Sequence, residues 1–231
     1  MGLLIALLVI FTWLGHLVYI LMFAEVPLTS PMLVVHIVVQ TYLYTGLFIT
    51  AHDAMHGLVS SNRIVNNGVG HTATRLFAAL SYSRLLEKHK LHHRFPGEVR
   101  DPDYCTTSQN FWRWWFSFLK NYISWWQFVI LAVVFNILQL WVNQWNLILF
   151  WILPSILATF QLFYFGTYQP HRLPHTEAML PHNSRTQKGQ HLWAMLSCYF
   201  FGYHFEHHES PHTPWWKLYQ IKNREYDEIT P

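Results

Sequence analysis

Apolar residues dominate four stretches of the chain, and each stretch is long enough to cross a lipid bilayer. A bilayer-spanning helix needs about 20 predominantly apolar residues. The four stretches are Leu3–Phe23, Leu33–Ala51, Trp126–Trp145 and Leu147–Tyr168. The first could also be a signal peptide, but it lacks a basic start and no A-x-A cleavage site follows it. We therefore predict an all-α integral membrane protein with four transmembrane helices.

The segments that connect these stretches differ in length and in charge. Residues 24–32 and 142–146 are short and contain no Lys or Arg, whereas all 15 basic residues lie within the long segments 52–125 and 169–231. The positive-inside rule places such basic segments in the cytosol. We therefore expect a multi-pass protein with both termini in the cytosol, where the two long segments form a histidine-rich helical cap.

Two shorter apolar segments lie within these long connections. Phe111–Trp126 is aromatic with interspersed basic residues, which is typical of an amphipathic helix at a membrane interface. We expect it to lie near the functional site. Leu192–Tyr203 is too short to span a bilayer, and we expect it to be re-entrant or packed against the helical bundle.

Composition supports a membrane location and a single domain of 231 residues. Hydrophobic residues make up 52% of the chain and charged residues only 12%, against about 25% charged in soluble domains. A net charge of +3 gives no indication of a nucleic-acid partner. Cys105 and Cys198 are too few for a disulfide framework, and we interpret both as free thiols.

Histidine is the unusual residue type, with 16 in the chain and eight of them in three clusters. The first cluster has two histidines four residues apart at the end of the second span, and each of the other two has the pattern H-x-x-H-H. These spacings place the imidazoles of a cluster on one face of a helix. The eight residues are His52 and His56, then His89, His92 and His93, then His204, His207 and His208.

The number of imidazoles indicates two metal ions. Neutral imidazole binds iron, zinc, copper and nickel, and a structural zinc site takes only four ligands. Eight imidazoles exceed the needs of one ion, but they suffice for two ions that keep open positions. Open positions allow a substrate or dioxygen to bind.

Other polar residues have two interpretations each. Asp53 follows the first ligand, so it is either a carboxylate that orients a ligating histidine or a surface acid paired with a basic residue. His171 follows the fourth span and is either a ninth ligand or a capping residue. His16 and His36 lie inside spans, where we favour hydrogen bonds between helices over a functional role. We interpret the remaining histidines as polar surface residues: His71, His175, His182, His191 and His212.

The clusters on this scaffold resemble the histidine boxes of the membrane fatty acid desaturase and hydroxylase superfamily. Four strings are more specific and resemble the bacterial beta-carotene 4-ketolases. They are FITAHDAMHG (48–57), HHRFPG with DPDY (92–104), FYFGTYQPHR (163–172) and FGYHFEHHESPHTPWWKL (201–218). The resemblance extends over nearly the whole chain.

The resemblance implies two iron ions, dioxygen as co-substrate and electrons from an external redox protein. It implies a carotenoid substrate, reached through membrane lipid and oxidised at carbon 4 of its β-ionone ring. His171 matches the position of a ninth ligand in desaturase-type relatives. Thr167 stands where those relatives carry an asparagine that contacts iron through water. We expect aromatic side chains near the fourth span to line a slot for the polyene: Phe163, Tyr164, Phe165, Phe200 and Phe201.

Other functions also fit parts of the pattern. A carotenoid 3-hydroxylase or a fatty acid desaturase would share the metal site and differ in product. A membrane metal transporter would need carboxylates along its spans, which this chain lacks. A structural zinc protein would need fewer ligands. The chain has no haem-binding or flavin motif, so the electrons required by the enzyme interpretations come from another protein.

Overall fold

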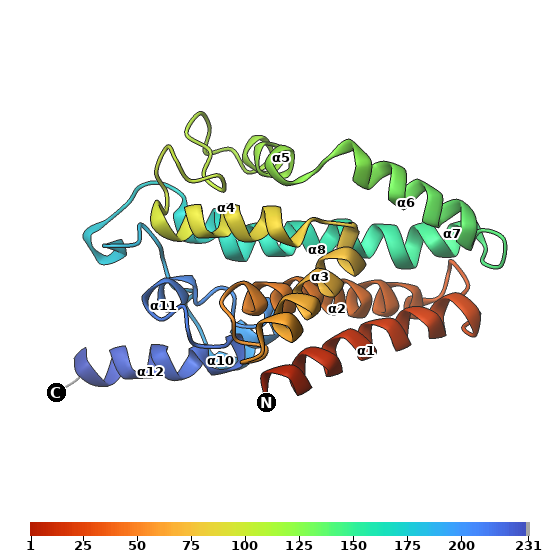
Figure 1. Cartoon of the computed structure of the whole chain (residues 1–231), viewed down its shortest axis with the longest axis horizontal. Coiled ribbons are helices and arrows are strands. Elements are labelled where there is room, and N and C mark those ends of the chain that lie inside the picture. Colours follow the sequence, from red (N-terminus) through yellow and green to blue (C-terminus); the bar gives the residue numbers. More distant parts are fainter. Residues whose placement is uncertain (230–231) are drawn as a thin grey trace.

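The computed structural model describes the backbone of residues 1–229 and the side chains of residues 1–223, and this part of the chain is helical without strands. Long helices run along the long axis of the molecule (Figure 1). They are α1 (Gly2–Met22), α2 (Pro31–Met55) and the continuous helix Gln144–His171, and each is long and apolar enough to span a membrane. The all-α membrane fold predicted from the sequence is confirmed.

The continuous helix Gln144–His171 contains two widened, π-helical turns. It consists of α7 (Gln144–Leu147), η1 (Ile148–Ile152), α8 (Leu153–Phe163), η2 (Tyr164–Tyr168) and α9 (Gln169–His171). Each π segment ends two residues before a proline, Pro154 or Pro170. Proline cannot donate a hydrogen bond to the carbonyl four residues earlier and its ring crowds that carbonyl. A local π turn accommodates both effects without ending the helix.

The third predicted span, 126–145, is wrong in its bounds. The helix there is α6 (Trp125–Leu138), about 21 Å long, which is shorter than the hydrocarbon core of a bilayer. It follows α5 (Phe111–Tyr122) after a bend of 85°, and the pair is long enough to span only if counted together. Ser124 and Gln127 form a capping box that starts α6 at the bend. The turn predicted at 142–146 lies at 139–143, because Asn143 caps α7.

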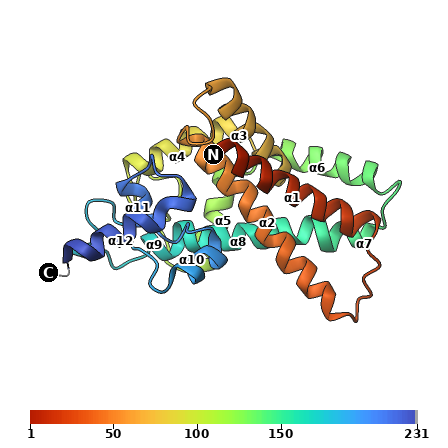
Figure 2. The ribbon, with the colours of Figure 1, turned by 90° about the horizontal axis from the view of Figure 1, so that it is seen from below.

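Shorter helices gather around the ends of the long ones. They are α3 (Arg63–Ala78), α4 (Tyr82–Arg94), α10 (His191–Cys198), α11 (His204–Glu209) and α12 (Leu218–Ile229), with 3₁₀ turns η3 (Glu177–Met179) and η4 (Trp215–Lys217). In Figures 1 and 2, α10, α11 and α12 lie at the end of the molecule opposite the α1–α2 and α6–α7 turns. The two short connections therefore share one end, and the histidine-bearing segments lie away from it.

Most of the helices pack through one large apolar core, and a smaller second cluster lies between α5 and α8. Trp13 and Leu17 of α1 lie in the large core together with Tyr44 and Leu47 of α2, and this core extends to Trp215 near the C-terminal end. The expected apolar segment 192–203 is α10 followed by a tight turn, and it packs against α8 with Cys198 fully buried. Cys105 and Cys198 are both unpaired.

Polar contacts also join the long helices. His16 of α1 lies 3.2 Å from His36 and 2.5 Å from the side-chain oxygen of Gln40, both on α2. The interpretation of His16 and His36 as residues that hydrogen bond between helices therefore agrees with the structure. Thr45 of α2 donates to Gln161 of α8 over 2.6 Å.

Candidate metal centre

The three histidine clusters lie on helices, as their spacing predicts. His52 is in the last turn of α2, and His56 is the residue that ends this helix. The second cluster is in the last two turns of α4, whose start is capped by Ser81. The third cluster makes up most of α11.

Tertiary packing brings these clusters together with His171 in two groups. The five-histidine group contains His52, His56, His89, His93 and His207. The four-histidine group contains His92, His171, His204 and His208. Within each group, one nitrogen from every residue lies within 4.8 Å of those of the others.

The spacing within a cluster decides which group each histidine joins. His89 and His93 are four residues apart and point to the five-histidine group, while His92 between them points to the four-histidine group. Positions 92 and 93 differ by about 100° around a helix. In α11, His204 and His208 join the four-histidine group, while His207 joins the other. Each H-x-x-H-H pattern therefore contributes imidazoles to both groups.

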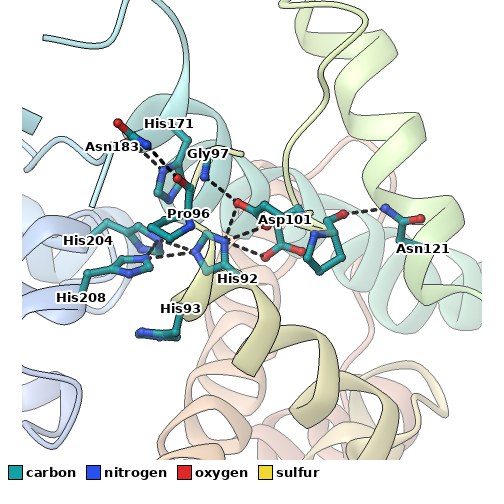
Figure 3. Close-up of polar contacts among 12 residues, drawn as sticks. His92, His93, Pro96, Gly97, Asp101, Asn121, His171, Asn183, His204 and His208 are labelled. Atoms are coloured by element: carbon teal, nitrogen blue, oxygen red, sulfur yellow. Dashed lines mark hydrogen bonds and ion pairs between the residues drawn. The ribbon is translucent and has the colours of Figure 1, made fainter. Parts of the chain in front are cut away.

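The nitrogen atoms in the four-histidine group converge on a common point. The Nε2 atoms of His92, His204 and His208 are 3.1–3.2 Å apart (Figure 3). Two nitrogens bound to one ion at about 2.0–2.1 Å lie about 2.8–3.4 Å apart for bond angles between a right angle and the tetrahedral angle. Three ring nitrogens that face one point cannot each form a hydrogen bond with both of the others. Their arrangement therefore fits a metal ion.

The ring nitrogens of the five-histidine group are equally close to one another. The Nε2 atoms of His56 and His89 are 2.8 Å apart, and those of His93 and His207 are 2.9 Å apart. Nε2 of His52 in this group and Nε2 of His171 in the other are buried and have no hydrogen-bond partner. Buried polar atoms are nearly always paired. Unpaired nitrogens directed into both groups are thus a further sign of metal sites.

Asp101 orients one of the candidate ligands, a role that the sequence analysis did not assign to it. Both of its carboxylate oxygens accept from Nδ1 of His92 at 3.0 Å, which leaves Nε2 of this ring for a metal (Figure 3). The backbone N–H groups of Gly97 and Asp103 donate to the same carboxylate. The acidic loop that follows the second cluster was the available signal. His171 is held similarly, through Nδ1 and the carbonyl of Asn183, 2.9 Å apart.

Burial and nearby charges shift the pKa values of the neighbouring residues His92 and His93 in opposite directions. Burial by itself lowers the pKa of His92, but the charges of Asp101 and Asp103 outweigh it and raise this pKa to about 9. Burial and the charge of His92 lower the pKa of His93 to about 2. Burial also holds the pKa values of His207 and His208 well below the usual range. Neutral imidazole is the form that binds metals.

Asp53 lies beside the clusters, but its carboxyl is directed elsewhere. It is buried, it accepts a hydrogen bond from the backbone N–H of Trp215, and its second oxygen has no hydrogen-bond partner. Among the residues that the structure describes, no histidine hydrogen bonds to it. Asp53 therefore joins the end of α2 to η4, and its role in the chemistry stays a prediction.

An apolar cavity adjoins both histidine groups. It encloses about 1050 Å³ of empty space including its open mouth, and His52, His89, His92 and His204 form part of its wall. Its other walls come from α2, α3, α5, α6 and α8. The expectation that α5 lies near the site is met, because Phe118, Leu119 and Tyr122 line the cavity.

Only one of the five expected slot residues lines this cavity, namely Phe201. Phe163 is fully buried against Trp114 and Phe118, and Phe200 packs on Tyr203. The other expected residues do not line this cavity, because Phe163 and Phe200 are taken up in these packing contacts, and η2 presents residues other than Tyr164 and Phe165 to it. Thr167 and Gly166 of η2 do line the cavity, and a Cβ at Gly166 would lie 2.0 Å from the Phe201 ring.

The remaining histidines are partly exposed or exposed at the surface. His182 pairs with Glu209, His175 contacts the carbonyl of His171, and His191 contacts Tyr203 and Asn223. His71 packs on Tyr82. They are the polar surface residues that the sequence analysis expected, although His182 also lies beside His208 with ring centres 5.5 Å apart.

Fold and site together define a membrane protein with a buried, histidine-rich metal site at one end of its long helices. Comparison with known proteins is more specific. The fatty acid desaturase family model matches residues 28–123 and 118–230, and the chain belongs to this family. No solved structure matches the chain.

Curated relatives indicate which branch of the family the chain resembles. A beta-carotene ketolase of Paracoccus sp. (strain N81106 / MBIC 01143) is 37% identical over 91% of this chain and 87% of its own. A beta-carotene ketolase of Paracoccus sp. (strain PC1) is 40% identical over 77% of this chain and 74% of its own. A zeaxanthin 4-ketolase of Chlamydomonas reinhardtii is 44% identical over 77% of this chain and 41% of its own. The resemblance to bacterial ketolases seen in the four strings is confirmed.

Proposed function

We propose that the chain is a carotenoid ketolase that oxidises carbon 4 of the β-ionone ring of beta-carotene to a ketone. The observation that carries this proposal is the apolar cavity whose wall includes histidines of both groups. A hydrocarbon ring in this cavity would lie beside both groups, and two curated relatives that cover most of the chain are named beta-carotene ketolases.

We further propose that the two histidine groups hold two iron ions. The five-histidine group would hold one ion through His52, His56, His89, His93 and His207, and the four-histidine group would hold the other through His92, His171, His204 and His208. Iron supplies the activation of dioxygen, using electrons from an external redox protein. Imidazole-rich donor sets suit iron, and also zinc or copper, so the metal has to be measured.

The residues of the chain have separate tasks in this reaction. Asp101 fixes the orientation of His92 by accepting from its Nδ1–H. Phe48, Phe77 and Leu162 bound the cavity with apolar surface, which excludes water from the oxidised carbon. Each hydroxylation consumes one dioxygen, two electrons and two protons and releases one water. A second hydroxylation of the same carbon gives a gem-diol, which loses water and leaves the ketone.

The orientation in the membrane is also a proposal. The basic residues lie in the segments that carry the histidines, and the short α1–α2 and α6–α7 connections contain none. We infer that the histidine end and both termini face the cytosol, where a soluble electron donor has access. The test is a reporter enzyme that is active only in the periplasm of a bacterial host. When it is fused after Pro231, the fusion should show no reporter activity.

The central experiment is expression in cells that produce beta-carotene. Extracted pigments should contain mono- and diketo carotenoids by chromatography and mass spectrometry. Accumulation of 3-hydroxylated carotenoids without keto products would assign the chain to the hydroxylases. Purified protein should contain about two iron ions per chain, one for each histidine group. Stoichiometric zinc without iron would contradict the iron assignment.

A further inference from the structure

His171 differs from the other members of the four-histidine group in how the chain places it. His204 and His208 share α11, and His92 lies within the second cluster on α4. His171 is instead the last residue of α9, and the backbone leaves helical geometry at Arg172. The last carbonyls of a helix have no partner within it. The position of a ligand at such an end therefore depends on contacts from outside the helix.

Arg185 supplies partners for the carbonyls around this helix end. Its backbone N–H donates to the carbonyl of Pro170 over 3.0 Å. Its guanidinium donates to the carbonyls of Arg172 and Pro174, and its Nη1 also lies 3.5 Å from the Pro170 oxygen. Positive charge near the C-terminal end of a helix is favourable as well. A single side chain thus holds the backbone on both sides of His171.

Asn183, two residues before Arg185, fixes the ring of His171. Its carbonyl lies 2.9 Å from Nδ1 of His171, and its side-chain nitrogen donates to the carbonyl of Pro96 over 3.1 Å (Figure 3). Pro96 follows the second histidine cluster in the chain. Asn183 has a φ of +46°, in the left-handed region where asparagine is enriched. This residue therefore connects His171 with the end of α4.

The residues that follow in the chain reach the third histidine cluster. Thr186 donates to Oε1 of Glu206 over 2.6 Å, and the backbone N–H of Gln187 donates to the carbonyl of Gly202 over 2.7 Å. Both acceptors lie within or just before α11. We call residues 183–187 the strap, because this segment connects the end of α9 with α11.

We propose that Arg185 is the positioning residue of His171, and that it holds the end of α9 on the strap so that the imidazole stays directed into the four-histidine group. This inference rests on the proposed metal assignment of that group. Nε2 of His171 is buried without a hydrogen-bond partner, and only its distance and direction have to be set. Without the guanidinium, the carbonyls of Arg172 and Pro174 lose this donor, and the end of α9 is attached to the strap less firmly.

The contacts of Arg185 require a guanidinium in particular. Its two terminal nitrogens bond to two different carbonyls, those of Arg172 and Pro174. A guanidinium presents such donors in a rigid planar fork, whereas a lysine ammonium presents all its donors at one point. Arg185→Lys keeps the positive charge but loses the fork. We therefore expect it to retain part of the positioning effect, between the wild type and Arg185→Met.

The test measures how tightly each of the two metal equivalents is held. Purified holoprotein is reduced without oxygen, and ferrous iron is withdrawn with a chelator whose iron complex is coloured. In Arg185→Met, one equivalent should be held about 10–100-fold more weakly, as when other groups that orient a ligand are lost. The other equivalent should be held as in the wild type. Lys188→Met, at an exposed basic residue just beyond the strap, is the matched control and should behave like the wild type.

A second substitution separates positioning of His171 from general stability of the fold. His171→Ala should weaken the same equivalent, and adding Arg185→Met should weaken it no further, because no imidazole remains to be positioned. A residue that acted through general stability would add its effect in the His171→Ala background. If Arg185→Met does not insert into membranes, Arg185→Lys is compared in the same two backgrounds.

The outcomes distinguish the role of Arg185 from the metal assignment. If His171→Ala leaves both equivalents unchanged, His171 is not a ligand, and the proposed metal assignment fails together with the positioning role. If His171→Ala weakens one equivalent and Arg185→Met weakens neither, only the role of Arg185 is overturned. Equal weakening of both equivalents in Arg185→Met, or further weakening in the double variant, overturns it as well.

Discussion

Replacing Lys222 with methionine tests how the C-terminal helix holds the third histidine cluster. Lys222 of α12 lies 3.3 Å from Glu206 of α11, and their side chains are 7% and 0% exposed. Lys222 also donates to Thr186 and to the carbonyl of Gln187, and it lies 4.6 Å from the centre of the Tyr203 ring. Glu206 stands between His204 and His207, so the ion pair fixes α11, which carries three of the proposed ligands.

The expected loss follows from the burial of the pair. Lys222→Met leaves the Glu206 carboxylate with the Thr186 hydroxyl as its remaining partner, and its second oxygen already has none. Breaking a buried ion pair from one side costs about 3–5 kcal/mol. For a chain of this length, such a loss lowers the melting temperature by about 6–20 °C. Metal retention should fall as well, because α11 loses its attachment.

A double-mutant cycle separates the ion pair from packing. Melting in detergent micelles is followed by circular dichroism for Lys222→Met, Glu206→Gln and the double variant. The double variant should melt above Lys222→Met, because no buried charge is left without a partner. Lys217→Met, at an exposed position of η4, is the control and should melt like the wild type. The reasoning would be refuted if Lys222→Met kept its full metal content and melted within about 2 °C of the wild type. This threshold corresponds to about half a kcal/mol.

Three further predictions concern the metal centre. Alanine at His93, or at any other histidine of the two groups, should abolish keto products and lower the iron content of membrane-inserted protein. His71→Ala is the control and should retain both. A histidine whose alanine variant keeps full turnover would be removed from the proposed ligands. Asp101→Asn should weaken metal binding about 10–100-fold in a chelator competition, because His92 loses its negatively charged acceptor. Wild-type affinity would contradict the assigned role. Asp53→Asn should lower turnover in a product assay while iron content is retained, because its carboxyl bonds to Trp215 and not to a ligand; a wild-type rate would make this acid purely structural.

Much of the architecture followed from local sequence patterns. Long apolar runs specify bilayer-spanning helices because backbone polar groups cannot remain unpaired in lipid. Histidines three and four residues apart share a helix face in any environment, so all three clusters were recognisable on helices. The capping box at Ser124 and Gln127 was also present in the sequence, and it would have placed the bend that shortens α6.

Tertiary structure alone decided how these parts combine. The division of neighbouring His92 and His93 between two groups depends on how α4 and α11 face each other, which no spacing along one helix specifies. The position of Asp101 against His92 depends on a loop that folds back over nine residues. His171 could be placed with His92, His204 and His208 only once the helix through η2 was positioned against α4 and α11. Local spacing sets the direction of a side chain, but which partners it meets depends on contacts between segments far apart in the chain.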